Sequence, residues 1–84
     1  MYFVYVLTTA KGTRYIGSTK NLERRMDEHA HGLVRSTKGR RPVRLFATRE
    51  FKNIKNAAIW EKKYKRSHGL LERDLKNNIF NIRS

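Results

Sequence analysis

Residues 2–18 read YFVYVLTTAKGTRYIGS, and this stretch decides how the fold begins. The run 2–9 is rich in aromatic and β-branched residues on both faces, which is typical of a central strand that is buried on both sides. The glycine-containing segment AKGTR predicts a turn, and RYIGS has strand character again. We therefore expect the chain to open with a β-hairpin.

The first helix and the segment after it are also marked by sequence. Helical periodicity starts near Asn21, where the polar run STKN can supply a cap, and it ends at Gly32, a common helix terminus. Residues 33–42 contain four cations, a glycine and the only proline, which predicts an exposed, mobile and positive loop. The remaining segments are a third strand (43–51), a helix (54–67), a short last helix (70–77) and a tail (77–84) that either packs as a final turn or frays.

These elements predict an α+β fold in the order β-β-α-β-α-α. Because amphipathic helices must cover the apolar faces of a sheet, the economical assembly is a small three-stranded antiparallel sheet flanked by helices. A chain of 84 residues is long enough for one domain with a modest core and too short for two. We therefore expect residues 1–84 to form a single domain.

Composition excludes several classes of site. The chain has no cysteine, so a disulfide framework, a thiolate metal site and a cysteine nucleophile are all ruled out. The apolar run that contains FVYVL is too short to cross a bilayer, and the N-terminus lacks the features of a secretory signal. These observations predict a cytoplasmic protein without a membrane partner.

The charge balance points to a polyanionic partner. Twenty Lys and Arg against seven Asp and Glu give a formal net charge of +13. An anionic membrane is disfavoured because the apolar stretches look like core elements and no Lys-rich amphipathic helix is suited to an interface, so we expect nucleic acid. The cations expected to contact the phosphate backbone are Arg35, Lys38, Arg40, Arg41 and Arg44, unless they only form a solvated loop.

Charged residues also lie on the faces that two helices should turn toward the core. At about 100° per residue, the first helix places an arginine and a histidine within the width of an apolar stripe. The members of that stripe are Leu22, Arg25, Met26 and His29. The corresponding face of the second long helix consists of Ala57, Trp60, Glu61, Tyr64 and His68.

Two explanations account for these inward charges. Burying either charge unpaired would cost several kcal/mol, so Arg25 and Glu61 could form a single structural ion pair. Alternatively, both point into a partly open cleft beside the sheet, where a metal or a phosphate completes the pairing. Two tyrosines add to the second explanation, although each alone would be typical of a core: hairpin pairing could bring Tyr5 and Tyr15 to one edge of the same cleft. Gly17 would leave the backbone open for close approach of a substrate.

Together these residues resemble a known family. Tyr5 within FVYVL, the segment YIGST from Tyr15, NLERRMDEH, and Glu61 in AAIWEKKYK are similar to the GIY-YIG nuclease superfamily, especially its small stand-alone bacterial members of the URI type. The resemblance covers nearly the whole chain, and Phe3-Val4-Tyr5 stands where the family name has Gly-Ile-Tyr. It implies a three-stranded antiparallel sheet with flanking helices and cleavage of DNA phosphodiester bonds with a divalent metal.

The resemblance also implies roles for residues. It makes Tyr5, Tyr15, Arg25, His29 and Glu61 the catalytic residues, with Glu61 as the metal ligand and no small-molecule cofactor. Larger members carry an asparagine near the end of the domain, and Asn81 resembles it but lies farther beyond Glu61 than expected.

The chemistry of phosphodiester hydrolysis suits these side chains. Glu61 would hold Mg²⁺ or Mn²⁺, hard ions that prefer carboxylate and water, and the planar Arg25 guanidinium matches two phosphate oxygens. A tyrosine of ordinary pKa, about 10, is a poor base, but a neighbouring cation favours the phenolate. We expect Tyr5 to be the base, with Tyr15 and His29 positioning water or relaying a proton, and the choice between the tyrosines stays open.

The expected function is therefore a metal-dependent DNA endonuclease of DNA repair or processing. Because the sequence ends at Ser84, we expect no separate DNA-binding domain, hence weakly specific or structure-directed cleavage by a monomer or weak dimer. The alternatives are a non-catalytic nucleic-acid-binding module and an RNA-directed or ribosome-associated protein, since net charge alone does not separate DNA from RNA.

Overall fold

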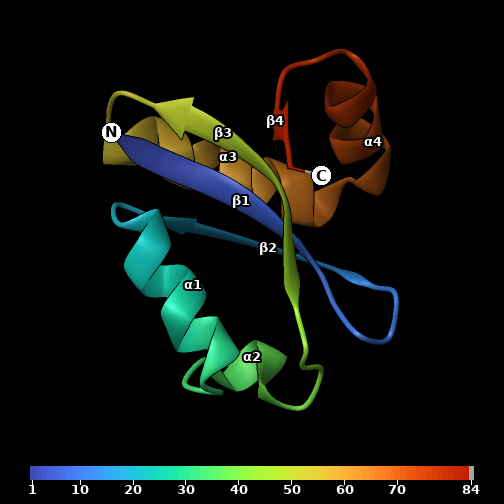
Figure 1. Cartoon of the computed structure of the whole chain (residues 1–84). Coiled ribbons are helices and arrows are strands. Elements are labelled where there is room, and N and C mark those ends of the chain that lie inside the picture. The colour runs from blue at the N-terminus through green and yellow to red at the C-terminus, as the bar shows by residue number, and fades with distance from the viewer. Residues whose placement is uncertain (84) are drawn as a thin grey trace.

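A computed structural model describes residues 1–83 as an antiparallel sheet of four strands with helices on both faces (Figure 1). The sheet has the order β2-β1-β3-β4, so β2 and β4 are its two edges. The strands are β1 (Tyr2–Thr8), β2 (Arg14–Thr19), β3 (Arg44–Phe51) and β4 (Asn81–Ile82). The helices are α1 (Leu22–Ala30), α2 (Arg35–Lys38), α3 (Ile54–Arg66) and α4 (His68–Lys76). The α+β class and the antiparallel sheet are confirmed.

The opening hairpin forms as predicted. Strands β1 and β2 pair with Tyr5 opposite Gly17 and Leu7 opposite Tyr15. In the turn, the Thr9 amide donates to the Thr13 carbonyl, and Gly12 adopts a positive φ of 79°, which a glycine tolerates without strain. Residues 4–7 are fully buried, as expected for a strand with neighbours on both sides.

The two faces of the sheet have different coverings. Alternate residues of β1, such as Val4 and Val6, contribute to an apolar core with Ala57 and Tyr64 of α3 and with α4. Tyr5 points to the opposite face, where it meets His29 of α1. Figure 1 shows this division, with α1 and α2 on one side of the strands and α3 and α4 on the other.

Side-chain caps explain where the longer helices begin. The Asn21 side chain accepts from the Arg24 amide at 3.0 Å, and Asn53 accepts from the Asn56 amide at 2.9 Å. Ser67 accepts from the Leu70 amide at 3.1 Å, so α4 starts at His68 instead of near residue 70. His68 is consequently exposed on α4, which corrects the expectation that it shares a face of α3 with Glu61.

Two further expectations were wrong in detail. Residues 33–42 are not only a loop, because α2 forms within them and buries Val34 and Thr37. The sheet has a fourth strand, since the tail packs Phe80 into the core and β4 then pairs with β3 at Ala47 and Thr48. The order of elements is therefore β-β-α-α-β-α-α-β. Across residues 1–83, every helix is too short or too polar to cross a membrane.

Candidate active site

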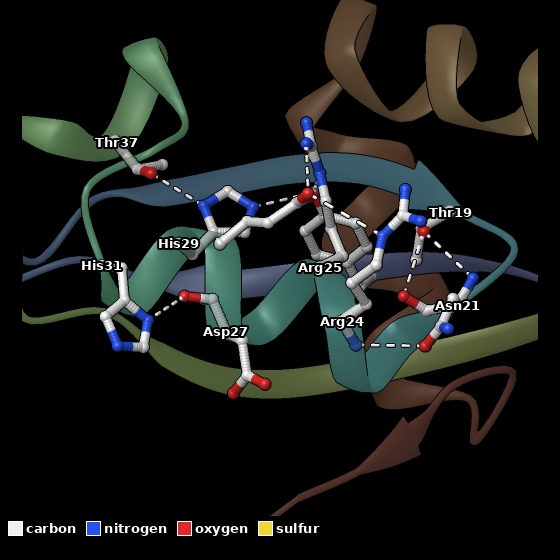
Figure 2. A network of polar contacts seen from close by, with 10 residues as sticks. Thr19, Asn21, Arg24, Arg25, Asp27, His29, His31 and Thr37 are labelled. Atoms are coloured by element: carbon white, nitrogen blue, oxygen red, sulfur yellow. Dashed lines mark hydrogen bonds and ion pairs between the residues drawn. The ribbon is translucent and has the colours of Figure 1, made fainter.

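A fully buried chain of polar side chains lies between the sheet and α1. The Tyr5 hydroxyl is 2.9 Å from Nε2 of His29, and Nδ1 of His29 is 2.7 Å from the Thr37 hydroxyl. Figure 2 shows the His29 ring directed toward Thr37, which α2 carries. Tyr5, His29 and Thr37 have no exposed surface, so this chain is sealed from solvent.

Gly17 makes room for the Tyr5 ring. A Cβ built on Gly17 would lie 2.6 Å from Cζ of Tyr5, far inside normal contact distance. The expectation that Gly17 leaves its backbone open for a substrate is thus corrected, because the Tyr5 ring fills that space. Because Gly17 has no side chain, the Tyr5 ring can occupy the space beside its strand partner.

Tyr15 lies beside this chain and is half-buried. Its ring centroid is 6.4 Å from that of Tyr5 and 5.4 Å from that of His29, with the latter pair in an edge-to-face arrangement. The hairpin register therefore brings the two phenols to one face of the sheet, as the sequence predicted. Tyr15 is partly exposed to solvent, whereas Tyr5 is fully buried.

Arg25 connects the buried chain to the surface. Its Nε donates to the Tyr5 oxygen at 3.4 Å, and its NH1 donates to Glu28 at 3.1 Å. About a third of the Arg25 side chain is exposed, 34%, which leaves part of the guanidinium open to a ligand. The hydrogen bond to Tyr5 raises the pKa of Arg25, which thus stays charged.

Glu61 approaches the same edge strand from the other face. Its Oε1 accepts from the Ser18 hydroxyl, and its Oε2 accepts from Nζ of Lys65 at 2.7 Å. Arg25 contacts Tyr5, the strand partner of Gly17, and Ser18 follows Gly17 on β2, so the two charges lie near neighbouring positions of the sheet on opposite faces. The single Arg25–Glu61 ion pair considered from sequence does not form among residues 1–83, because each charge has other partners.

Burial determines the protonation of the inner groups. Burial raises the pKa of Tyr5, against the opposing effect of the Arg25 hydrogen bond. Burial and then the Arg25 charge lower the pKa of His29. Both groups are therefore neutral at pH 7, and the phenolate expected for Tyr5 beside a cation is disfavoured in this closed arrangement.

The predicted phosphate-binding cations lie along one segment but differ in their contacts. Arg35, Lys38 and Arg40 are exposed in and after α2, and Arg44 is exposed at the start of β3. Arg41 instead donates to the carbonyls of Lys38 and Ala30, at 3.1 and 3.3 Å. It thereby ties the segment to the end of α1, a structural contact that the sequence did not indicate.

A family assignment follows from this arrangement and from sequence comparison. The profile of the GIY-YIG catalytic domain matches residues 1–75. The chain belongs to the GIY-YIG family. Two tyrosines, an arginine, a histidine and a glutamate thus gather around β2 in a member of a nuclease superfamily, in agreement with the resemblance seen in the sequence.

Several proteins named UPF0213 are similar in sequence to this chain. The UPF0213 protein BH0048 of Halalkalibacterium halodurans is 39% identical over 61 residues, which span 71% of this chain and 65% of the relative. A UPF0213 protein of Lactococcus lactis subsp. cremoris is 39% identical over 83 residues, 93% of this chain and 83% of that one. A UPF0213 protein of Nitratidesulfovibrio vulgaris is matched over 61% of its length, at 40% identity.

A solved structure shares the fold. The solution NMR structure of the UPF0213 protein BH0048 from Bacillus halodurans aligns with a TM-score of 0.56 at 34% identity. The alignment covers 92% of this chain and 84% of that one.

Sequence reasoning did not identify several partners of the GIY-YIG residues. Thr37, Ser18 and Lys65 each bind one of the candidate residues, yet a threonine or serine beside glycines and cations carries no chemical signal of its own. Lys65 could have been found from its i, i+4 spacing to Glu61, a common ion-pair geometry on helices. Asn81, the weakest candidate, lies in β4 at the edge of the sheet opposite to β2.

Proposed function

We propose that the protein is a divalent-metal-dependent DNA endonuclease of weak sequence specificity that serves DNA repair or processing. The observation that carries the proposal is that Arg25 and Glu61 do not pair with each other. Arg25 contacts Tyr5, whose strand partner is Gly17, and Glu61 contacts Ser18, the next residue of the edge strand. A buried ion pair would have cancelled both charges. Two separate, partly exposed charges of opposite sign instead suit a phosphate and a metal that approach β2 together.

Glu61 is the residue that would hold the metal. Its carboxylate is partly exposed. One carboxylate oxygen accepts from the Ser18 hydroxyl and the other accepts from Lys65. Among residues 1–83, no group of three or more His, Cys, Asp and Glu side chains converges on one point. A single carboxylate fits Mg²⁺ or Mn²⁺, which bind through one or two carboxylates, waters and substrate phosphates. When bound, such an ion would stabilise charge on the phosphate in the transition state.

Arg25 would bind the scissile phosphate. Tyr5 and Glu28 hold Nε and NH1 of its guanidinium, so the remaining N–H groups have a fixed direction. A guanidinium that is held before the substrate arrives stabilises the growing negative charge without a cost of reorganisation during the reaction.

The burial of Tyr5 changes which tyrosine is placed to contact the attacking water. Because Tyr5 has no exposed surface and a raised pKa, it is poorly placed to contact an attacking water. Tyr15 is half-buried on the same face and is the phenol that can reach such a water. In our proposal Tyr15 positions the attacking water, while Tyr5, itself bonded to His29, holds Arg25.

The exposed cations would bind the DNA backbone. Arg35, Lys38, Arg40 and Arg44 follow α1 in the chain, and the sequence from 35 to 44 contains no aromatic residue on which a base could stack. This favours phosphate contact over base stacking. Contacts of this kind position a duplex and read no sequence, so cleavage should depend on DNA structure more than on base order.

A nicking assay tests the proposal. Supercoiled and branched DNA are incubated with the protein and Mg²⁺ or Mn²⁺, beside a metal-chelated control. We expect nicking by the wild type and a loss of at least about 100-fold in Glu61→Gln, which keeps the side-chain size but removes the charge that a hard metal requires. Its melting temperature should fall by no more than about 4 °C, because an exposed i, i+4 pair contributes little to stability.

A matched carboxylate variant controls for the change of charge. Glu50 is exposed on β3, and Glu50→Gln should nick DNA at the wild-type rate. Normal cleavage by Glu61→Gln would contradict the proposal. Metal-independent binding of DNA without any nicking would instead identify a nucleic-acid-binding module that keeps the nuclease fold.

A further inference from the structure

Thr37 is a buried polar residue inside a positively charged, exposed segment. It lies in α2 between the exposed Ser36 and Lys38, yet its own side chain has no exposed surface. Its hydroxyl is 2.7 Å from Nδ1 of His29, the nitrogen on the far side of the ring from Tyr5. Nothing in the proposed chemistry requires a hydroxyl here, so its burial needs another reason.

The hydrogen bonds of Tyr5 show which nitrogen of His29 carries the proton. Arg25 can only donate, so its Nε–H occupies the Tyr5 oxygen as an acceptor. Within residues 1–83, the other polar partner of the Tyr5 hydroxyl is Nε2 of His29. A protonated Tyr5 must therefore donate to Nε2, which then carries no hydrogen. Because His29 is neutral, its single N–H is at Nδ1 and donates to the Thr37 oxygen.

We propose that Thr37 is a positioning residue for Arg25, acting through His29 and Tyr5. The Thr37 oxygen holds the His29 proton on Nδ1, Nε2 then fixes the Tyr5 hydroxyl, and the Tyr5 oxygen holds Nε of Arg25. The role in cleavage rests on the proposed function, whereas the order of hydrogen bonds holds for the folded protein itself.

The position of Thr37 in α2 also links these hydrogen bonds to the exposed cations. Arg35 and Lys38, two of the exposed cations, flank Thr37 within a single helical turn. The helix α2 would therefore contact the DNA backbone through Arg35 and Lys38, and it also supplies Thr37, the last residue of the buried hydrogen-bond series.

The protonation of His29 tests the proposal directly. NMR of ¹⁵N-labelled wild-type protein distinguishes the two ring nitrogens of a histidine by their shifts and their carbon-bound hydrogens. We expect a neutral His29 with hydrogen on Nδ1 and none on Nε2. A hydrogen on Nε2 in the wild type would overturn the proposal without any assay of activity.

Variants at position 37 then connect this proton to catalysis. Thr37→Val keeps the shape but removes the acceptor for Nδ1–H, so we expect a changed or mixed His29 tautomer and a kcat for nicking about 10- to 100-fold lower. KM for DNA should stay within about 2-fold, because Thr37 does not face the substrate. Thr37→Ser keeps the hydroxyl and should retain the wild-type tautomer and kcat, as should Ser36→Ala, which removes the neighbouring exposed hydroxyl.

Two results would overturn the role of Thr37. One is a Thr37→Val protein with the wild-type tautomer and kcat, and the other is a folded Thr37→Ser protein that is as inactive as Thr37→Val. If Thr37→Val does not fold, the wild-type tautomer and the Thr37→Ser rate decide. If the wild type nicks no DNA with either metal, the proposed function fails, and the NMR result still decides the order of hydrogen bonds.

Discussion

The sheet has a buried tyrosine hydroxyl on each face, and the two are bound differently. On the α1 face, the Tyr5 hydroxyl lies between Arg25 and the neutral His29. On the α3 face, the Tyr64 hydroxyl accepts from NH1 of Arg49 at 2.6 Å and donates to Oδ2 of Asp74 at 2.6 Å.

The difference lies in where the arginine finds its countercharge. Asp74 is buried and only 3.9 Å from Arg49, whose guanidinium also stacks on Trp60 at 4.4 Å. Asp74 also pairs with Arg73 at 3.5 Å, so the buried carboxylate has two cations beside it. Arg25 has its carboxylate partner, Glu28, at the surface with 30% of the side chain exposed, and its buried partners carry no charge. An arginine and a tyrosine thus form a structural network with a buried aspartate on the α3 face, whereas on the α1 face the arginine stays partly exposed and can bind a ligand.

Arg49→Ala should have the largest effect, and it should be on stability. Removing the guanidinium takes the inner cation from the buried Asp74 and the donor from Tyr64, and it leaves Asp74 only the largely exposed Arg73, 3.5 Å away. We expect a cost of about 3 kcal/mol in the free energy of unfolding. For so small a domain this approaches the total stability. Urea denaturation measures the change. A loss of less than about 1 kcal/mol in the free energy of unfolding would show that Arg49 is no more important for stability than a surface residue.

Arg25→Ala should show the opposite pattern. We expect nicking to fall by about 100- to 1,000-fold, since a donor to the developing charge is lost. The free energy of unfolding should change by less than in Arg49→Ala, because Arg25 is partly exposed and its carboxylate partner can be solvated. Single-turnover nicking and urea denaturation of the same sample give both values, and an active Arg25→Ala protein would break the comparison.

Substitution of the exposed cations should affect binding and leave both networks intact. The double variant Arg35→Ala, Arg40→Ala should weaken binding to unrelated DNA sequences alike and make the slope of log K against log salt shallower by about 2. Arg41 is unsuitable for this test because it bonds backbone carbonyls. Fluorescence anisotropy at several salt concentrations measures the slope, and a loss confined to one DNA sequence would argue for base contacts instead.

The smallest expected effect is a dependence of stability on pH from His29. Burial and the Arg25 charge place its folded pKa below the unfolded value of about 6.5, so the unfolded chain binds the proton more readily. This contribution to stability is present above pH 6.5 and is lost as the pH falls through the folded pKa. The groups that contact or surround His29 are Tyr5, Tyr15, Arg25, Glu28 and Thr37.

Urea unfolding at pH 7.5 and 5.5 measures this dependence. His29→Gln should lose more of it than His31→Gln, which changes an exposed histidine just after α1. Equal behaviour of the two variants would show that His29 is protonated in the folded protein without cost.

The Tyr64 network offers a comparison at the alkaline end. Burial and the hydrogen bond to Asp74 raise the pKa of Tyr64 to about 12. Its contribution to stability is therefore fully present below pH 10 and is lost as the pH rises toward 12.

Local patterns were enough to predict much of the fold and the main candidate residues. The hairpin followed from two β-rich runs around a glycine turn, and the Asn21 cap followed from its position before a periodic segment. Arg25, His29 and Glu61 stood out because a polar residue in an apolar stripe violates the local rule, as functional sites often do.

The remaining features depend on contacts between distant segments. Ser18 and Glu61 are 43 positions apart, and β4 exists only because β3 leaves an edge for two residues to pair with. The burial of Thr37 depends on α2 packing under α1, which no pattern within residues 33–42 encodes. The opposite approach of Arg25 and Glu61 required the register of β1 and β2, because adjacent strand residues face opposite sides.

The space beside Gly17 makes the glycines of this chain unequal in mutational tolerance. Even a methyl group at position 17 would collide with the ring of Tyr5, whereas one at Gly39 would meet no atom within 4 Å. In a library of all single substitutions selected for nuclease activity, position 17 should accept glycine alone and position 39 should accept many residues. A second-site replacement of Tyr5 by a smaller residue should restore folding to Gly17→Ala but not cleavage, because Tyr5 fills the space and also holds Arg25.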